Sequence, residues 1–524
     1  MIEHSRANRA YIALNGLAER IHAWLGGAVG TDGSYPAPAL AKRAVQAIVE
    51  PMFSPFLREY GARAAAGTDL PPGASGKFCC GGYGIDLETG RVAPELRTAL
   101  RCIAEFAALW LQHLAVFLQW ALRRPGGDGP ATLVFGVGRD SIWAGGSDAR
   151  FLDYCRKGPI APLSQASRLL VQTGPDRPEA GLPDGRHAHY VRFPQQALLL
   201  GQRFSARWLA ELLYGHCAAL LEYLRLMARA PALCALGRDY ASHALATSLA
   251  RRGLIESVVL TVSNYSRQLL WMTDLPGRRF RCHMVWYSMS SNPLTYKADP
   301  VFAAFPLYQY IRADDFWLWT PGQAAFLARV GIPGERHTIG PILWYLPGVP
   351  PRQDRPEFRV AVFDVLPVSE AWNRTYGLPY NYYETANAIR FIRDITAAAH
   401  AAESALGRRV SLVLKHKRPV AAIHDAAYQA ALAEAGAPPH GRLESVPPDT
   451  DIFSLIASAD LVVVIPFSSP AYIASHLGVP SVYHDPTGAL APLYEQAPGI
   501  QFSGSDQELA RTFQAVLARA IEAA

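Results

Sequence analysis

Residues 461–486 read LVVVIPFSSPAYIASHLGVPSVYHDP, a stretch in which two apolar runs flank a short polar segment. Both runs are rich in valine and have the length of strands, and Pro470 and Gly478 bracket the segment between them. Continuous apolar strands are typical of parallel sheets that are buried on both faces. The stretch therefore predicts a strand, a short helix that begins at Pro470, and a second parallel strand.

The same alternation of strands and helices extends over most of the chain. After the proline-rich segment LPGVPPRQDRPEF, the runs FRVAVFDVLP and SLVLKHKRP read as strands, and helical segments separate them. An earlier alternation begins with ATLVFGVG at Ala131 and continues through ESVVLTV and RCHMVWY. We therefore expect an α/β protein with two Rossmann-like, doubly wound domains that face a cleft. The first spans residues 130–346 and the second spans residues 355–524.

Residues 1–129 carry helical periodicity and predict an N-terminal helical region. Because the N-terminus has neither the basic start nor the apolar run of a signal peptide, we expect a cytoplasmic protein.

The segment 102–124 is long and apolar, but polar residues interrupt it, which argues against a membrane span. One interpretation is a helix that is buried or faces a partner. The other is a helix in the membrane interface, with Trp110, Trp120, Arg123 and Arg124 at the lipid headgroups, which would make the protein peripheral at the inner membrane.

Composition and charge narrow the function classes. Half of the residues are hydrophobic and 18% are charged, which is typical of a packed globular protein. The formal net charge of +6 suits an anionic ligand or a membrane surface, and it does not predict nucleic acid as a partner. The seven cysteines lack zinc-site spacing, and the motifs of phosphate loops, serine hydrolases and zinc proteases do not occur. The adjacent Asp314 and Asp315 are weak evidence for a metal, so we expect no metal cofactor.

Two serines precede the predicted helix at Pro470. Ser469 is placed to cap the helix, because its side-chain oxygen can accept from the free backbone amides while proline takes the first helical position. This leaves Ser468 unexplained. A helix N-terminus at the carboxyl end of a parallel strand is suited to a phosphate group, and a second hydroxyl adds a donor.

Two further strand ends carry charged residues. The strand SLVL runs into Lys415, His416, Lys417 and Arg418, which form either a solvated basic turn or a cationic group that neutralises a departing phosphate. Asp364 ends the first strand of the C-terminal domain, and we expect its carboxylate to face the interdomain cleft. It either braces a loop or acts as a nucleophile, a general base or a hydroxyl ligand.

These features together resemble bacterial GT-B glycosyltransferases that use CMP-activated acidic sugars. A basic strand end, a paired-serine loop that opens a helix, and the following GVPSVYHDP carry the resemblance over about residues 131–520. It implies that Ser468 and Ser469, with Lys415, Lys417 and Arg418, hold the phosphate of CMP. The His-Pro dipeptide of these enzymes is absent here, since His416 and Pro419 are separated.

The resemblance is closest to the retaining β-Kdo transferases of surface polysaccharide biosynthesis. It implies transfer of Kdo from CMP-β-Kdo to a glycan or lipid-linked acceptor, with Asp364 as the nucleophile of a double displacement and with no metal. Acceptor or sugar contacts are expected at Asp140, Trp143, Tyr287 and Lys297, at predicted strand ends of the first α/β domain.

Two alternatives remain open at the level of sequence. One is a sialyltransferase or another nucleotide-sugar transferase of the GT-B fold; if it is an inverting enzyme, Asp364 acts as a base or has no role. The other is a non-catalytic scaffold of a polysaccharide assembly complex.

Overall fold

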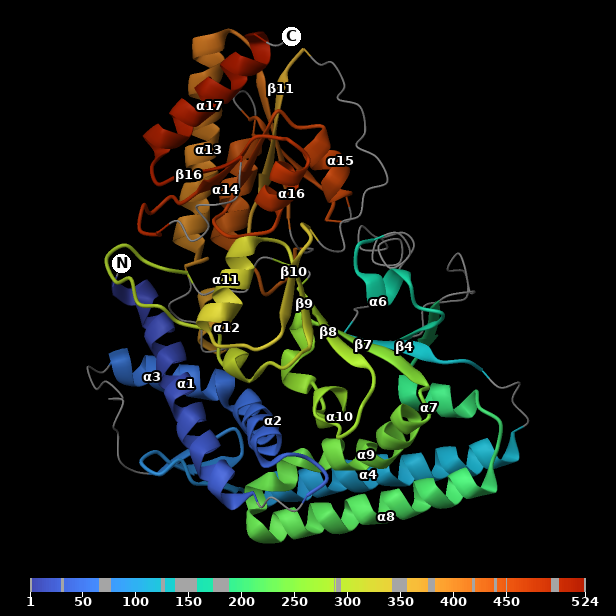
Figure 1. Cartoon of the computed structure of the whole chain (residues 1–524). Coiled ribbons are helices and arrows are strands. Elements are labelled where there is room, and N and C mark those ends of the chain that lie inside the picture. The colour runs from blue at the N-terminus through green and yellow to red at the C-terminus, as the bar shows by residue number, and fades with distance from the viewer. Residues whose placement is uncertain are drawn as a thin grey trace.

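The computed structural model describes residues 2–29, 33–65, 77–123, 128–136, 158–172, 188–286, 288, 294–341, 356–375, 382–416, 420–437, 441–448, 450–491 and 499–522. It has three parts: a mostly helical N-terminal region, a seven-stranded sheet, and a six-stranded sheet above them (Figure 1). Both large sheets are parallel throughout and are flanked by helices. The predicted fold class, a GT-B-like arrangement of two doubly wound domains with an N-terminal helical region, is confirmed.

The C-terminal sheet has the strand order β13-β12-β11-β14-β15-β16, which is 3-2-1-4-5-6 in order of appearance. Its strands are β11 (Phe358–Phe363), β12 (Val410–Lys415), β13 (Leu443–Val446), β14 (Leu461–Val464), β15 (Ser481–His484) and β16 (Ile500–Ser503). Its helices are α12 (Glu370–Thr375), α13 (Thr385–Leu406), α14 (Ala426–Gly436), α15 (Ile452–Ala457), α16 (Pro470–His476) and α17 (Asp506–Glu522). All residues of β14 and β15 are buried, as their apolar runs predict. The order of the strands reverses between β11 and β14, where ligands of doubly wound sheets bind.

The middle sheet has the order β10-β9-β8-β7-β4-β5-β6. Its strands are all parallel, and the order in which they follow one another across the sheet reverses between β4 and β7. Its strands are β4 (Ala131–Phe135), β5 (Leu169–Gln172), β6 (Ala188–Val191), β7 (Ile255–Thr261), β8 (Arg281–Val285), β9 (Asp315–Leu318) and β10 (Glu335–Thr338). Its α-helices are α6 (Ala161–Ser164), α7 (Pro194–Leu200), α8 (Ala206–Arg229), α9 (Gly237–Arg251), α10 (Leu270–Thr273) and α11 (Pro321–Arg329), and its short 3-10 helices are η4 (Pro231–Leu236), η5 (Val262–Arg267) and η6 (Tyr308–Tyr310).

The N-terminal region contains a small sheet that its helical periodicity does not predict. Helices α1 (Ile2–Ala28), α2 (Ala37–Val49), η1 (Glu50–Met52), α3 (Phe53–Ala65) and α4 (Leu96–Leu122) accompany an antiparallel sheet of β1 (Lys77–Cys80), β2 (Tyr83–Asp86) and β3 (Val92–Pro94). Gly81 and Gly82 join β1 to β2 with φ angles of 60° and 84°. Two successive left-handed residues suit a two-residue hairpin, so the Gly-Gly pair was the available signal.

The N-terminal region shares one core with the middle domain. Leu14 of α1 and Ile48 of α2 belong to the same buried cluster as Leu133 of β4. The next residue of β4, Val134, points to the opposite face and belongs to a second cluster, which includes the core of the C-terminal domain. The alternation of side chains along β4 therefore joins all three parts.

A short backbone contact ties the two α/β domains together. Tyr296 forms an isolated bridge with Leu490, and the amide of Lys297 donates to the carbonyl of Ala489 at 2.8 Å. The amide of Ala491 donates to the carbonyl of Thr295 at 2.9 Å. The loop after β15 is thereby fixed against the middle domain.

Helix α4 is the one described helix that is long and apolar enough to cross a membrane. One side of it packs against the protein, because Phe117 and Trp120 are fully buried. Trp110 is half-buried and stacks on His216 of α8, with ring centroids 4.6 Å apart. The expectation that Trp110 and Trp120 lie at lipid headgroups is therefore wrong, because both rings fill the contact with α8. Arg124 lies outside the described residues.

Candidate functional site

The carboxyl ends of β11 and β14 bring two of the predicted site segments together. Asp364 follows β11 directly, and residues 465–469 follow β14. The ladder between the two strands continues into this site, because the amide of Ile465 donates to the carbonyl of Phe363 at 3.1 Å. Asp364 and the paired-serine loop therefore flank the point at which the strand order of the C-terminal sheet reverses.

The Asp364 carboxylate is held by two side chains. The hydroxyl of Tyr428, on α14, donates to Oδ2 at 2.7 Å, and Nδ1 of His416 lies 3.1 Å from the same oxygen. The Asp364 side chain is only 1% exposed, so the carboxylate that we expected to face the interdomain cleft is covered in this structure. Its other oxygen, Oδ1, is buried and has no hydrogen-bond partner among the described residues. Asp364 is therefore an oriented, buried carboxylate with one oxygen available, which makes it a candidate for a catalytic role.

The environment of Tyr428 keeps its hydroxyl protonated, so that the hydroxyl donates the hydrogen bond to Asp364. Burial, and then the negative charge of Asp364, raise the pKa of Tyr428 well above its ordinary value. The phenol therefore stays protonated and orients the carboxylate at every physiological pH. His416 contacts Asp364 through Nδ1, which leaves Nε2 as the ring's second polar atom.

Lys415 and His416 point in different directions, as alternation along β12 predicts. Nζ of Lys415 donates to the carbonyl of Pro448 at 2.7 Å, and the residue is buried. In this structure Lys415 thus braces the loop between β13 and α15 and does not present its charge at an open strand end. Lys417 and Arg418 lie outside the described residues, so their predicted phosphate contacts stay predictions.

The backbone of the paired-serine loop is held in place by hydrogen bonds from two tyrosines. Phe467 has a φ of 64°, which is unusual for a non-glycine residue. Tyr383 donates to the carbonyl of Pro466 at 3.0 Å, and Tyr483 donates to the carbonyl of Ser468 at 2.7 Å. The hydroxyl of Ser468 donates to the carbonyl of Ile465 at 3.3 Å. The loop therefore presents its serines from a braced backbone.

Ser469 takes the N-cap position of α16 but does not cap it through its side chain. The predicted capping bond is wrong for a backbone reason. Ser469 has φ −62° and ψ −30°, which is already helical, whereas a capping side chain needs an extended backbone to reach the free amides. Side-chain capping of α16 therefore does not explain why two serines stand at this position.

The family of the chain follows from its sequence over these elements. Residues 222–513 match the model of a family described as "Polysaccharide biosynthesis PFTS motif protein". The chain belongs to this family. Within the match, Pro466, Phe467, Ser468 and Ser469 read P-F-S-S, which differs from the four letters of the family's motif by serine in place of threonine.

Comparisons with individual proteins give weaker likenesses. No curated protein matches the chain. Among solved structures, the wall teichoic acid polymerase TagF is 10% identical with a TM-score of 0.38, over 82% of this chain and 92% of that one. A trehalose-phosphate synthase from Burkholderia vietnamiensis is 12% identical with a TM-score of 0.37, over 74% and 91%. TarM is 11% identical with a TM-score of 0.31 over 52% of each chain, so this chain spans about half of TarM's length. Values of this size imply nothing about the donor or the acceptor.

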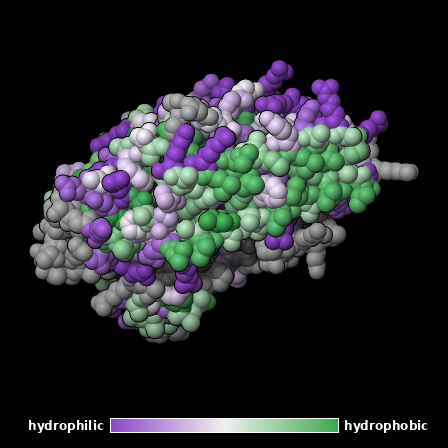
Figure 2. All heavy atoms as spheres, turned by 90° about the horizontal axis from the view of Figure 1, so that it is seen from below, coloured by the Kyte–Doolittle hydropathy of each residue, from purple (hydrophilic) through white to green (hydrophobic). Residues whose placement is uncertain are grey.

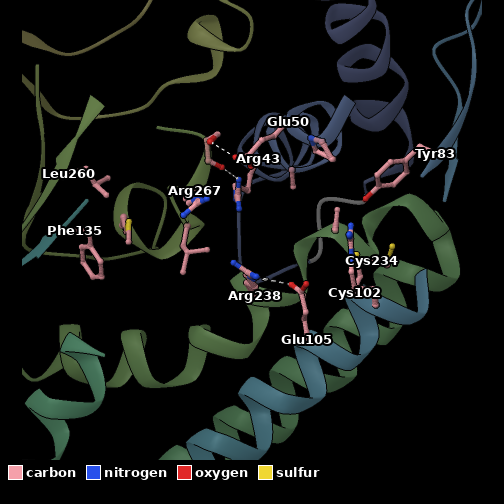
Figure 3. Close-up of a pocket in the computed structure, with 18 of the residues that line it drawn as sticks. Arg43, Glu50, Tyr83, Cys102, Glu105, Phe135, Cys234, Arg238, Leu260 and Arg267 are labelled. Atoms are coloured by element: carbon pink, nitrogen blue, oxygen red, sulfur yellow. Dashed lines mark hydrogen bonds and ion pairs between the residues drawn. The ribbon is translucent and has the colours of Figure 1, made fainter. Parts of the chain in front are cut away.

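A second candidate site of this PFTS-motif protein is a pocket of about 720 Å³ above α4 (Figure 3). Phe135, Gln172 and Leu260 line it from the carboxyl ends of β4, β5 and β7, where the strand order of the middle sheet reverses. Four arginines also line it, and they come from α2, α4, α9 and η5: Arg43, Arg101, Arg238 and Arg267. The pocket therefore has the position of a ligand site and cationic walls.

The four arginines differ in how they are bound. Arg43 is buried in an ion pair with Asp239 at 3.2 Å, and Arg238 pairs with Glu105 at 3.0 Å. Arg101 and Arg267 are exposed and have no ion-pair partner in the described part of the chain. An anionic group in the pocket would therefore meet two uncompensated guanidinium groups.

The pocket also contains a thiol with a shifted pKa. A hydrogen bond from Cys234 and the nearby charge of Arg101 lower the pKa of Cys102 to about 7, against the opposing effect of burial. The helical pattern of the N-terminal region gave no reason to select Arg43, Arg101 or Cys102, because the pocket forms only when α2 and α4 pack on the middle sheet.

The predicted acceptor residues fall elsewhere. Asp140, Trp143 and Tyr287 lie outside the described residues. Lys297 is exposed at the junction of the two α/β domains, where Nζ donates to the carbonyl of Gly488 at 3.0 Å. This contact involves the loop that Asp485 organises: the buried Asp485 carboxylate accepts from the hydroxyl of Tyr382 at 2.6 Å and from the amide of Leu490 at 2.7 Å.

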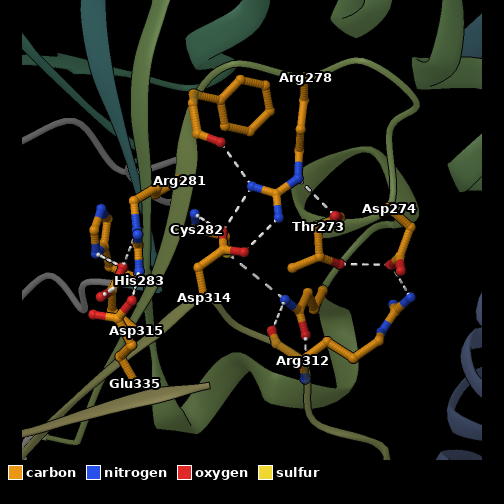
Figure 4. Close-up of polar contacts among 12 residues, drawn as sticks. Thr273, Asp274, Arg278, Arg281, Cys282, His283, Arg312, Asp314, Asp315 and Glu335 are labelled. Atoms are coloured by element: carbon orange, nitrogen blue, oxygen red, sulfur yellow. Dashed lines mark hydrogen bonds and ion pairs between the residues drawn. The ribbon is translucent and has the colours of Figure 1, made fainter. Parts of the chain in front are cut away.

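The aspartates considered for a metal belong to two separate ion-pair groups (Figure 4). Asp314 accepts two hydrogen bonds from Arg278, at 2.6 and 2.7 Å. Asp315 points to the other face of β9, where it pairs with Arg281 at 2.7 Å and with His337 at 2.9 Å.

Among the described residues, the group that has the ligand types and spacing for a metal ion consists of Asp315, Glu335 and His337. Arg281 already donates to both carboxylates of this group, and the group lies at the amino ends of β9 and β10. Ligands of such sheets bind at the opposite edge. An ion-pair network explains the group.

Proposed function

We propose that the chain is a glycosyltransferase of polysaccharide biosynthesis that transfers an acidic sugar from a CMP-activated donor, with CMP-β-Kdo as the donor. The observation that carries the proposal is the position of Asp364 beside the paired-serine loop, at the switch point of the C-terminal sheet, with Oδ1 buried and without a hydrogen bond from any residue that the structure describes. Nucleotides bind at such switch points in doubly wound sheets. Family membership supports the polysaccharide context.

The proposed reaction is a double displacement. Oδ1 of Asp364 attacks the anomeric carbon of the sugar, the bond to the phosphate oxygen breaks, and CMP leaves with the electron pair. An acceptor hydroxyl then attacks the same carbon from the opposite face, the bond to Oδ1 breaks, and the carboxylate is restored. Two inversions give net retention. The proton of the acceptor hydroxyl is proposed to pass to Nε2 of His416, because this ring contacts Asp364 through Nδ1 and not through Nε2.

The hydrogen bonds of Asp364 fit this role. Tyr428 and His416 both contact Oδ2, so they fix the direction of Oδ1 without using it. Because the Asp364 side chain is 1% exposed, binding of the donor has to uncover Oδ1. Ser468, Ser469, Lys415, Lys417 and Arg418 are proposed to hold the phosphate of CMP, and one phosphate with cationic partners needs no divalent metal.

The acceptor is proposed to be a glycan or a lipid-linked oligosaccharide that carries an anionic group. The cationic pocket at the switch point of the middle sheet, with Arg101 and Arg267, supports an anionic acceptor. Asp140, Trp143, Tyr287 and Lys297 remain proposed contacts of the acceptor or the sugar. The protein would then act at the cytoplasmic face of the membrane.

The decisive experiment is intact-protein mass spectrometry after incubation with CMP-β-Kdo and no acceptor. We expect a covalent adduct with the mass of one Kdo residue on the wild type and none on Asp364→Asn. Asp506→Asn is the matched control, because it removes an exposed carboxylate at the start of α17 in the same domain. This control should form the adduct like the wild type. An adduct that persists in Asp364→Asn would overturn the role of Asp364.

An inverting transferase is the second candidate, and one observation favours it. The 3.1 Å contact of His416 Nδ1 with Asp364 has the arrangement in which a carboxylate orients a histidine base. In that case no adduct forms, turnover falls in both His416→Gln and Asp364→Asn, and the product has inverted configuration.

Calorimetry with CMP separates both enzymes from a non-catalytic scaffold. We expect binding that survives EDTA and is lost in the Ser468→Ala/Ser469→Ala variant, with a weaker effect of Lys415→Ala because that ammonium also bonds Pro448. If the wild type does not bind CMP, the CMP-donor proposal is wrong.

A further inference from the structure

Helices α4 and α8 lie side by side along one face of the molecule, below the middle sheet (Figure 1). They run antiparallel, because Phe106 stacks on Tyr223 at 4.5 Å while Trp120 contacts Trp208 at 4.8 Å. Both pack against α9, which lies on their inner side. We call the outer face of this pair the α4–α8 floor.

The middle of the α4–α8 floor is apolar. Between Arg101 and Gln119, every exposed residue of α4 is apolar, and Leu111 and Leu118 are 59% and 64% exposed. Between Glu211 and Arg225, the exposed residues of α8 are apolar, tyrosine or cysteine. The large exposed apolar residues of the floor are Leu96, Leu100, Ile103, Leu111, Leu118, Leu122, Leu213, Tyr214, Leu221 and Leu224. Figure 2 shows a broad, largely apolar band on this face.

The inner faces of the two helices are packed through specific contacts. The exposed apolar band is therefore not part of the hydrophobic core of the domain. Nε2 of His216 lies 3.0 Å from the carbonyl of Trp110, and Nδ1 of His113 lies 2.9 Å from the carbonyl of Ala241 in α9. Burial lowers the pKa of His113 to about 4, so it packs as a neutral ring. The floor is therefore a preformed surface.

Both ends of the floor are basic. Arg97 and Arg101 at the start of α4 lie at the same end as Arg225 and Arg229 of α8, because the helices are antiparallel, and all four are exposed. The other end carries the exposed residues Arg123, Arg203 and Arg207. Of the acidic residues nearby, Glu105 pairs with Arg238, and Glu211 pairs with both Arg207 and Arg252, while Glu95 is exposed at the start of α4; arginines outnumber acidic residues at both ends.

We propose that the α4–α8 floor docks in the headgroup region of an anionic lipid bilayer, with both helices parallel to the membrane plane. An apolar band between basic ends matches acyl chains flanked by anionic headgroups. A second copy of the chain fits less well. Face-to-face pairing of two floors about a two-fold axis would place arginines against arginines at both ends, and such like-charge contacts are unfavourable.

Docking also has a geometric consequence for the pocket above α4. Arg101 is both a lining residue of that pocket and a residue of the basic end of the floor. A docked floor therefore holds one wall of the pocket at the level of the headgroups. The docking proposal does not depend on the identity of the donor.

Vesicle sedimentation tests the proposal with the full chain. We expect the wild type to bind POPC vesicles with half POPG, to bind pure POPC more weakly, and to lose affinity as salt rises. Leu111→Glu/Leu221→Glu should bind at least about tenfold more weakly, because two apolar side chains lose their burial in lipid. Ile521→Glu is the matched control: Ile521 is an exposed apolar residue of α17, far from the floor in sequence and fold, and this variant should bind like the wild type.

Two further measurements keep the result interpretable. Circular dichroism and CMP calorimetry of Leu111→Glu/Leu221→Glu should equal those of the wild type, which separates lost docking from lost folding or lost donor binding. Light scattering after size exclusion reports the oligomeric state. A wild type that does not bind POPG vesicles, or a dimer that Leu111→Glu/Leu221→Glu splits into monomers, would overturn the proposal.

Discussion

Tyr428→Phe isolates the hydrogen bond that orients Asp364. The substitution keeps the buried ring and removes only the hydroxyl, which donates to Oδ2 at 2.7 Å. A hydrogen bond to a charged acceptor contributes about 1.5–3 kcal/mol to stability, whereas one between neutral groups contributes about 0.5–1.5 kcal/mol. We therefore expect Tyr428→Phe to lower the free energy of unfolding of the C-terminal domain by about 2 kcal/mol. For a domain of this size, that corresponds to a decrease in Tm of about 4–8 °C.

Tyr383→Phe in the same domain is the matched control. The Tyr383 hydroxyl donates to a neutral acceptor, the carbonyl of Pro466, at 3.0 Å. Its loss should cost about 1 kcal/mol, or about half the decrease in Tm. Differential scanning calorimetry measures both variants. Because two domains can unfold in separate steps, hydrogen exchange at β11 and α14 assigns the change to the right domain.

A double-mutant cycle with Asp364→Asn completes the test. The two substitutions should couple by about 1 kcal/mol, since Tyr428→Phe removes the donor, whereas Asp364→Asn keeps an acceptor oxygen and removes only its charge. A Tyr428→Phe variant as stable as Tyr383→Phe, or a coupling energy near zero, would refute the reasoning that a charged Asp364 carboxylate accepts this bond. In the proposed reaction, Tyr428→Phe should lower kcat more than it changes KM, because it misdirects Oδ1 without touching CMP.

Three further outcomes are expected. The rate of Cys102 alkylation by iodoacetamide should rise with pH and reach half its maximum near pH 7, because the Cys234 hydrogen bond favours the thiolate of Cys102. Peptide mass spectrometry gives the rate, and a midpoint near pH 9 would contradict this expectation. Burial lowers the pKa of His113 and His243 to about 4. Below about pH 6.5, the ordinary pKa of histidine, these side chains therefore bind protons in the unfolded chain but not in the folded chain. The Tm should fall as the pH drops from about 6.5 to about 4, and it should fall less in His113→Gln. Zinc should not raise the Tm of the wild type in a thermal-shift assay, because Arg281 occupies the carboxylate of Asp315; a marked rise would indicate a metal site there.

Local sequence patterns predicted the elements of the C-terminal domain. The strands β11, β12, β14 and β15 are short apolar runs that end in polar residues, and each forms where its run lies. Because strands buried on both faces must be apolar throughout, the pattern and the structure share one cause. In the N-terminal region the same approach missed β1 to β3, since these strands of three or four residues are only partly buried and lack the continuous apolar runs of the parallel strands, and only the Gly81-Gly82 pair marked the hairpin.

The sites were predictable only in part. A residue just after a buried strand lies at the ligand edge of the sheet, so Asp364 and Ser468 could be chosen from the sequence. The partners of Asp364 could not. Tyr428 comes from the first turn of α14, 64 residues away, and nothing in its local sequence distinguishes it from other buried tyrosines. Lys415 was expected at the phosphate, yet its side chain reaches Pro448 because the loop after β13 packs against it.

The sequence by itself determined the order of strands and helices, the fold class, and which segments end at the carboxyl edge of the C-terminal sheet, because these follow from local periodicity and chain connectivity. Only the tertiary structure decided which groups meet across elements. It joined His416 and Tyr428 to Asp364, assembled the arginine pocket from α2, α4, α9 and η5, and paired α4 with α8 so that their apolar faces form one floor. Such contacts depend on packing between residues far apart in the chain, and local patterns carry no record of them.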